Sequence, residues 1–313
     1  MSHSSAVSRR QFVQLGLAGL ASAGLASAAL AAKLHSVIDG LHIGMQTFSF
    51  RMMRYPDIVS AVQQVGVGEV ELWSAQVEPT AAEQPDIMKW RDTVSLDYFK
   101  DIRKKFNDAG IDIYTYNPRF GAGGFGRGRG RGPGSAPGQP GAAAAPPAEP
   151  PPPQITDAQI DRIFEFTKAL GAKNLSSQMS LDMAKRLVPF AEKHKMIVGV
   201  ASGDEDMLTS LPAISPYLRM DVDVGNFTHL GEDPLQFVKD NYEHLLDVHL
   251  KDCKFKGPSV PFGKGDSHLK EILQFLASKK TQVRANIDCD YPGTGTSVDE
   301  VKKCYDYVKS CLA

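Results

Sequence analysis

The chain has 313 residues, of which 42% are hydrophobic and 23% are charged, so its composition excludes a disordered protein and provides for a substantial core. Its 35 basic and 36 acidic residues argue against a nucleic acid or a membrane surface as the main partner. Four cysteines in a chain of this length exclude a disulfide scaffold.

Residues 1–32 are expected to be a twin-arginine export signal. Arg9 and Arg10 precede an uncharged run rich in Leu, Ala and Gly, which ends in small residues near Ala31. Paired arginines before such a weakly hydrophobic run are typical of signals that are cleaved after export. The alternative is a membrane-anchoring helix, since the run is just long enough to span a bilayer. The mature protein is therefore expected to be periplasmic or otherwise exported through the twin-arginine pathway, with no membrane partner after cleavage.

Residues 119–154 are expected to be a flexible, low-complexity insertion. Ten of these 36 residues are Gly and nine are Pro, and such a composition cannot bury a core. The Arg/Gly stretch at 126–132 is also of a kind that contacts polyanions, but a solvated loop is the simpler interpretation. Subtracting the 32 residues of the signal and the 36 of the insertion from 313 leaves 245. This is close to the roughly 250 residues of a (β/α)8 barrel.

Strand and helix patterns alternate along the rest of the chain. Before the insertion, apolar runs predict strands at 41–50, 69–73 and 111–116, and helical spacing predicts helices at 56–65 and 96–109. After it, the predicted strands are 173–177, 196–201, 218–224, 245–250 and 283–289. The helices between them are expected after Thr156, after Ser180, at 207–214, from Pro234, at 269–277 and from a cap at Ser297. Eight strand–helix pairs predict one (β/α)8 TIM barrel over residues 33–313, interrupted by the insertion after the third strand, with the active site where the strands end.

Polar side chains interrupt the apolar strands near their ends. Charged residues recur at every second position on four strands: Glu69 and Glu71; Asp221 and Asp223; Asp247, His249 and Lys251; Asp288 and Asp290. Such residues share one face of a strand, and a buried charge is costly unless it is paired or bound to a metal. The pattern predicts a site for a divalent metal, Mn²⁺, Mg²⁺, Co²⁺ or Zn²⁺. The alternative is an internal salt-bridge network that includes Lys251 and Arg219.

Five segments together resemble the sugar phosphate isomerase/epimerase group of the xylose isomerase-like TIM barrels. They are GMQTFSF at 44–50, EVELW at 69–73, VHLKD at 248–252, PFGKGD at 261–266 and ANIDCDYPG at 285–293. Many exported members of this group carry twin-arginine signals, which agrees with the N-terminal segment. The resemblance implies a metal held by Asp223, His249 and Asp288.

The chain departs from the pattern of this group at two positions. Ala201 stands where the resemblance implies a further ligand and base, and Asn226 stands where it implies a histidine. Asp204, Glu205 and His229 are the candidates to replace the missing acid.

The resemblance also implies a reaction, proton abstraction next to the carbonyl of a sugar or sugar derivative. The metal would polarise the carbonyl, Asp288 would remove the proton, and Lys251 would bind a substrate oxygen. The alternative for Lys251 is a salt bridge to Asp223 or Asp288. The predicted substrate-binding residues are Gln46, Phe48, Trp73, Asn226 and Asp290, and core packing is the alternative for Phe48.

Three functions follow from the sequence. The first is a metal-dependent sugar isomerase or epimerase. The second is a lyase or hydrolase of oxidised (3-keto) glycosides on the same barrel, which needs only one base. The third is a barrel that binds carbohydrate, or supports a partner subunit, without catalysis. Under each, a small sugar is the expected ligand and nucleic acid is not; the oligomeric state is left open.

Overall fold

The computed structural model describes residues 32–80, 82–84, 86–120 and 155–313. The expected signal, except for Ala32, and the expected insertion, except for Arg119 and Phe120, lie outside these residues. Within the described ranges, no helix is both long and apolar enough to cross a membrane.

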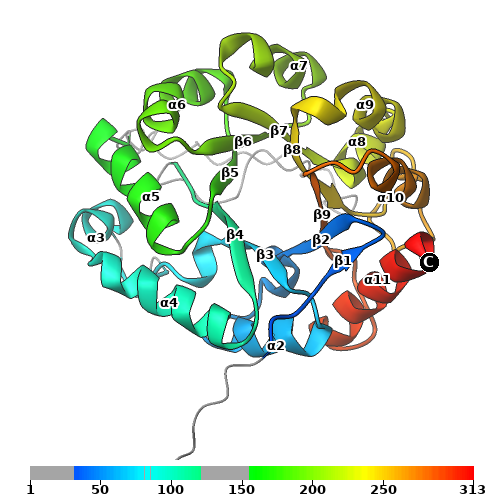
Figure 1. The fold of residues 1–313 in the computed structure, drawn as a ribbon, viewed down its shortest axis with the longest axis horizontal. Coiled ribbons are helices and arrows are strands. Elements are labelled where there is room, and N and C mark those ends of the chain that lie inside the picture. The colour runs from blue at the N-terminus through cyan, green and yellow to red at the C-terminus, as the bar shows by residue number, and fades with distance from the viewer. Residues whose placement is uncertain (1–31, 81, 85, 121–154) are drawn as a thin grey trace, which may run out of the picture. The chain divides into compact units, whose positions relative to one another are not determined.

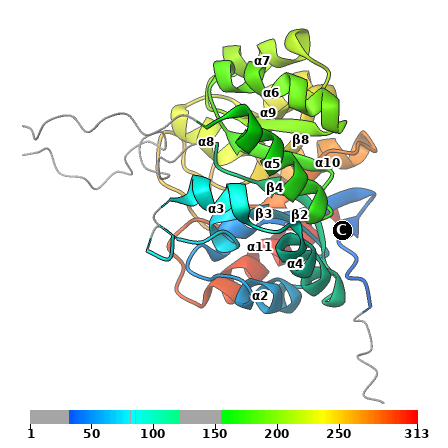
Figure 2. The same ribbon diagram turned by 90° about the vertical axis from the view of Figure 1, so that its left-hand side faces the viewer.

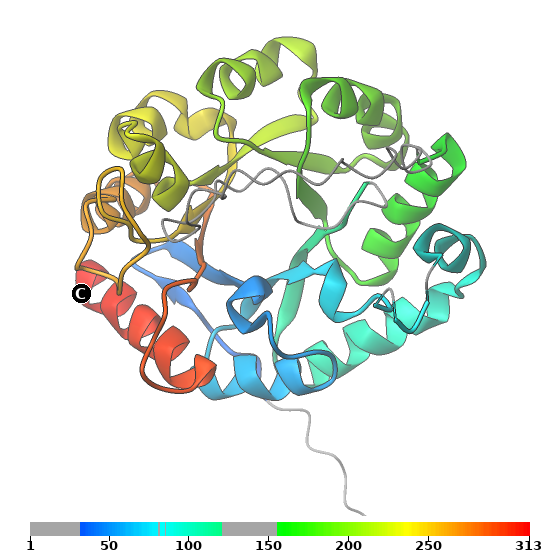
Figure 3. The ribbon, with the colours of Figure 1, turned by 180° about the vertical axis from the view of Figure 1, so that it is seen from behind.

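Eight parallel strands close into a barrel in the described part of the chain (Figures 1 and 3). They pair in chain order, and the first of them also pairs with the last, which closes the ring. The strands are β2 Leu41–Gln46, β3 Glu69–Trp73, β4 Asp112–Asn117, β5 Asn174–Gln178, β6 Ile197–Ala201, β7 Leu218–Asp223, β8 Leu245–Leu250 and β9 Arg284–Ile287. A short strand, β1 Val37–Ile38, adds an antiparallel hairpin to β2.

Helices follow the strands and surround the barrel (Figure 2). They are α2 Asp57–Val65, α3 Ile87–Thr93, α4 Leu96–Asp108, α5 Asp157–Ala169, α6 Leu181–His194, α7 Glu205–Ile214, α8 Val224–Leu230, α9 Pro234–Asn241, α10 Leu269–Ser278 and α11 Ser297–Leu312. Thr156 and Gln159 form a reciprocal capping box at the start of α5, and Ser180 caps α6. The predicted (β/α)8 barrel is confirmed.

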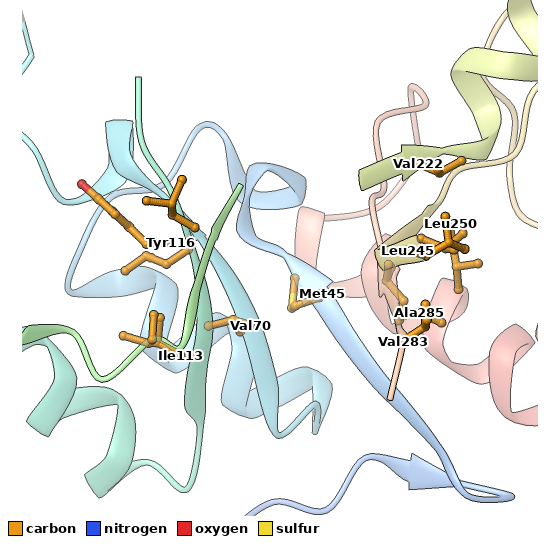
Figure 4. Close-up of a cluster of buried hydrophobic side chains, with 14 of the residues drawn as sticks. Met45, Val70, Ile113, Tyr116, Val222, Leu245, Leu250, Val283 and Ala285 are labelled. Atoms are coloured by element: carbon orange, nitrogen blue, oxygen red, sulfur yellow. The ribbon is translucent and has the colours of Figure 1, made fainter. Parts of the chain in front are cut away.

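The two faces of each strand have different chemistry. Apolar side chains such as Met45, Val70, Val222 and Ala285 are buried, and Figure 4 shows a cluster of them. Successive residues of a strand point to opposite faces, so the side that meets the helices forms the hydrophobic core. The barrel interior receives the polar residues instead, and these meet across it.

The structure also contains β1 and α3, which the sequence did not predict, and three further differences from the prediction have a clear local cause. The strand expected at 41–50 ends at Gln46, whose side-chain oxygen accepts from the N–H of Phe48 and starts a 3-10 turn at Thr47–Phe50. The cap of α11 is Thr296 and not Ser297, because the Thr296 hydroxyl accepts from the N–H of Asp299. Helix α8 was not expected; it begins directly after β7, where Asp223 accepts from the N–H of Asn226.

Candidate active site

Four ionisable side chains meet inside the barrel. Glu71 comes from β3, Asp221 from β7, and Asp247 and His249 from β8; one donor atom of each lies within 4.8 Å of the others. His249 Nε2 is 2.9 Å from Glu71 Oε2 and 3.3 Å from Asp221 Oδ1. All four residues are buried. We call Glu71, Asp221, Asp247 and His249 the floor group.

Neutral polar side chains hold the floor group in place. Gln46 and Asn117 donate to Glu71 Oε1 at 3.0 and 2.6 Å. Tyr114 and Asn286 donate to Asp247 Oδ2 at 3.2 and 3.0 Å. Ser176 donates to Asp221 Oδ2 at 2.5 Å. These contacts come from four different strands, β2, β4, β5 and β9, so the barrel itself fixes the geometry of the group.

Burial and mutual repulsion shift the pKa values of the floor group. Burial raises the pKa of Asp221 to about 6, although the charge of His249 opposes the shift. Burial and the neighbouring charge of Asp221 raise the pKa of Asp247 well above its usual range. Burial alone would lower the pKa of His249, but the carboxylates of Asp221 and Glu71 outweigh it and raise that pKa well above its usual value. All three shifts favour the protonated form of the side chain, so the floor group takes up protons more readily than isolated side chains do.

The floor group fits a divalent cation. Among the described residues, Asp221 Oδ1 and Asp247 Oδ1 are buried and accept no hydrogen bond, although His249 Nε2 lies 3.3 Å from Asp221 Oδ1 as an ion-pair contact. Three buried carboxylates face a single imidazole, so a proton or a cation is needed to balance their charge. Carboxylate oxygens and an imidazole nitrogen are ligands of Mn²⁺, Zn²⁺ and related ions. Glu71, Asp221, Asp247 and His249 could hold such a metal.

A second cluster lies around Lys251, which follows β8. Its Nζ is 2.9 Å from Asp223 Oδ2 and 3.2 Å from Oδ2 of both Asp288 and Asp290. Asp288 is fully buried. Burial alone would raise the pKa of Asp223, but the ammonium group of Lys251 outweighs it and lowers the pKa. We call Lys251, Asp223, Asp288 and Asp290 the lysine cluster.

Gly225 on α8 leaves room for the stem of Lys251. A Cβ atom on Gly225 would lie only 2.6 to 2.9 Å from the Cβ, Cγ and Cδ atoms of Lys251. No larger residue fits at this position without displacing the lysine.

A pocket of about 270 Å³ opens at the carboxyl ends of the strands. Asp221 and His249 of the floor group line it, as do Asp223 and the residues of the loop after β6 and of α8. Its volume is just below the range of about 300–1,000 Å³ that is usual for small-molecule sites, which suits a ligand no larger than a monosaccharide.

Two aromatic rings form one side of the pocket. Phe48 and Trp73 meet edge to face, with ring centroids 5.0 Å apart. The guanidinium of Arg119 lies 5.6 Å from the Trp73 ring, and that of Arg51 lies 5.5 Å from the Phe48 ring. A half-exposed aromatic face of this kind can pack against the C–H surface of a ring-shaped ligand.

The structure distributes the sequence-predicted residues over these features. Gln46, Phe48, Trp73 and Asn226 line the pocket. His249 belongs to the floor group, whereas the other two predicted metal ligands, Asp223 and Asp288, contact Lys251. Asp288, Asp290 and Lys251 are not among the residues that line the pocket.

The salt-bridge network considered as the alternative is present around Lys251, but without Arg219. That side chain donates to the backbone carbonyl of Glu243. Among the candidates to replace the missing acid, His229 lines the pocket, while Asp204 is exposed and caps α7.

Sequence reasoning did not select Glu71, Asp221 and Asp247 as ligands. All three were recognised as polar residues on strands, but their meeting depends on the stagger of the strands. In the barrel, Asp221 pairs in register with Asp247, and Asp223 with His249. The sequence signal for these ligands was a pair of acidic residues two positions apart on one strand. Such a pair does not show which of its two acids lies deeper in the barrel.

Solved structures with a similar fold are known for this chain. No family model and no curated protein matches the sequence. The fold is similar to a xylose isomerase domain protein from Planctomyces limnophilus, with a TM-score of 0.59 and 15% identity over 86% of this chain and 95% of that one. It is similar to the probable 3-DHS dehydratase AsbF from Bacillus anthracis, with a TM-score of 0.57 and 13% identity over 85% and 98%.

A third solved structure is 3-keto-D-glucoside 4-epimerase, YcjR, from E. coli in its apo form. Its TM-score is 0.56 and its identity 12%, over 87% of this chain and 100% of that one. At these identities the likeness concerns the fold. These comparisons therefore show that the chain has a TIM-barrel fold.

Proposed function

We propose that the protein is a sugar isomerase or epimerase that removes a proton from a carbon next to a carbonyl, assisted by a divalent cation. The observation that carries this proposal is the position of the floor group at the bottom of a pocket with an aromatic side. The pocket accommodates a small polyhydroxylated ligand, and the floor group supplies the charge for carbonyl chemistry.

Different residues of the chain would bind the cation and the sugar. Glu71, Asp221, Asp247 and His249 would hold the cation, which as a Lewis acid stabilises negative charge on the carbonyl oxygen. Its donors, three carboxylates and one imidazole, suit Mn²⁺, Mg²⁺, Co²⁺ or Zn²⁺. The Phe48–Trp73 pair would orient the sugar ring, and the amide of Asn226 would bind a hydroxyl group.

Asp223 is the best placed proton acceptor. It lines the pocket, and its lowered pKa keeps it ionised at neutral pH. Lys251 holds its carboxylate at 2.9 Å. The role predicted for Asp288 is less direct in this arrangement, since its carboxylate is fully buried against Lys251. Asp288 and Asp290 would thus position Lys251, and Lys251 would position Asp223.

A lyase or dehydratase is the second candidate function. The likeness to a probable 3-DHS dehydratase supports it, since elimination also starts with removal of a proton next to a carbonyl. One base suffices for that reaction, and Asp223 would supply it.

Because of the Arg9–Arg10 motif, we also propose that the reaction takes place after twin-arginine export.

Solvent exchange tests the proposed function. The purified protein with Mn²⁺ in D₂O is incubated with ketoses, aldoses and 3-keto-glucosides, and deuterium at the carbon next to the carbonyl is followed by NMR. We expect exchange with formation of an isomer, loss of isomer formation in Asp223→Asn, and loss of both exchange and isomer formation in His249→Ala. Release of water or an aglycone would favour the lyase. Binding without exchange of any compound would overturn the proposal in favour of a non-catalytic barrel.

The variant Asp288→Asn tests whether the catalytic base is Asp223, as proposed, or Asp288, as the sequence predicts. If Asp288 positions Lys251, this variant should keep part of the activity, and Asp223→Asn should keep none. The reverse order would return the role of the base to Asp288.

A further inference from the structure

His229 is a titratable pocket residue that the proposed mechanism leaves unused. It lies near the end of α8 and lines the same pocket as Asp223. The other titratable side chains in the pocket are engaged, because Asp221 contacts His249 and Asp223 contacts Lys251. Within the described ranges His229 forms no ion pair.

A single hydrogen bond fixes the tautomer of His229. Its Nδ1 is 2.8 Å from the backbone carbonyl oxygen of Gly257. A carbonyl oxygen can only accept, so Nδ1 carries the hydrogen and Nε2 carries the lone pair. The bond to Gly257 is kept when Nε2 becomes protonated, since Nδ1 donates in both states. The ring can therefore gain or lose a proton at Nε2 without losing its anchor.

The surrounding backbone holds the histidine in the pocket wall. The loop after β8 contacts α8 a second time, where the N–H of Lys256 donates to the carbonyl of Thr228 at 3.0 Å. On the other side, Gly203 allows α8 to approach the loop after β6. A Cβ atom there would lie 2.7 Å from Asn226 Nδ2 and 2.8 Å from a methyl group of Leu230. The position of His229 is thus fixed from both sides.

Inversion of a carbon centre needs two proton-transfer groups, because the proton leaves one face and returns to the other. Asp223 and His229 stand at the two ends of α8, six residues apart, which corresponds to about 9 Å along a helix axis. A backbone rise of this size is compatible with a reacting carbon held between the two side chains, since each proton-transfer group must come within hydrogen-bond reach of that carbon's proton.

We propose that His229 is the second proton-transfer residue of an epimerase, an inference that rests on the proposed function. Asp223 accepts the proton as the C–H electron pair moves onto the carbonyl oxygen. The electron pair then returns to the carbon, which takes a proton from Nε2–H of protonated His229 on the opposite face. Both groups afterwards re-equilibrate with water, and the reverse reaction exchanges their roles.

The test compares the two epimers of a sugar that the wild-type protein interconverts in D₂O. His229→Asn keeps an N–H that can reach Gly257 but has no base at the position of Nε2. We expect interconversion to fall by about 100-fold or more, in the range of general acid–base catalysis. Exchange should stay near the wild-type rate for the epimer that Asp223 deprotonates and be lost for the other. His244→Asn, a change of an exposed histidine, is the matched control and should leave both rates unchanged.

The outcomes that would contradict the role of His229 differ from the outcome that would contradict the proposed function. Equal loss of exchange for both epimers, or no change for either, would exclude His229 as a proton-transfer residue while leaving the proposed function in place. No exchange by the wild-type protein would overturn the proposed function itself. Imidazole ¹⁵N NMR of the folded wild-type protein gives a readout that does not depend on activity: we expect the Nδ1–H tautomer for His229, and an Nε2–H tautomer would refute the assignment.

Discussion

Replacing Lys251 by Met should destabilise the protein strongly. Methionine keeps most of the length of the side chain but removes an ammonium group that faces three carboxylates at 2.9 to 3.2 Å. Asp288 is fully buried and would be left without its ion partner. Removing one partner of a buried pair typically costs about 3–5 kcal/mol, mostly because the remaining charge is uncompensated. We expect a loss of this size in the free energy of unfolding at pH 7.

Urea denaturation measures this loss, with the slope of the transition as a check that the same surface unfolds. Adding Asp288→Asn removes the uncompensated charge, so the double variant should be more stable than the sum of the two single changes predicts. The matched control is Lys100→Met, which breaks an exposed pair with Asp97 and should cost less than about 1 kcal/mol. A Lys251→Met loss as small as that of the control would refute the view that the lysine cluster is a buried ion network.

Three further predictions concern other parts of the fold. Gly225→Ala should destabilise the protein because of contact with Lys251, although Ala normally stabilises a helix by about 1 kcal/mol relative to Gly; a higher melting temperature would contradict this. Glu300→Gln should lower stability at neutral pH but not near pH 2. Hydrogen bonds, above all from Lys303, lower the pKa of Glu300 from 4.5 to about 2. The stabilisation from the ionised Glu300 is therefore present above pH 4.5 and is lost as the pH falls towards 2. A gap that persists in melting scans at pH 2 would refute it. Mn²⁺ should raise the melting temperature of the wild-type protein and not that of His249→Ala; an equal shift in both would place the ion elsewhere.

The barrel could be predicted from the sequence because its signals are local. The caps at Thr156 and Ser180 and the change from strand to helix periodicity each depend on a few neighbouring residues. The 3-10 turn after β2 and helix α8 were missed for a related reason. Each starts with a side chain, Gln46 or Asp223, that folds back onto the backbone where an apolar run continues in the sequence.

The candidate site could be predicted only in part. The sequence identified which strands carry inward acids, and His249 is in the floor group as a predicted ligand. The sequence could not determine which acids lie at the same height along the barrel axis, because the stagger of strands in a barrel is set by closure of the whole ring. The β7–β8 register places Asp221 beside Asp247, and Glu71 reaches His249 from β3. Lys251 in turn contacts Asp223 and Asp288, the two acids that the sequence assigned to the metal.

The most direct test of this account is the location of Mn²⁺ by anomalous X-ray scattering from crystals soaked in the ion. We predict one strong peak bonded to His249 Nε2 and to carboxylate oxygens of Glu71 and Asp221, beneath the pocket. A peak bonded to Asp223, His249 and Asp288, with Lys251 displaced, would contradict the assignment of the cation to the floor group. A crystal with no peak near either cluster would contradict a metal-assisted reaction in this pocket.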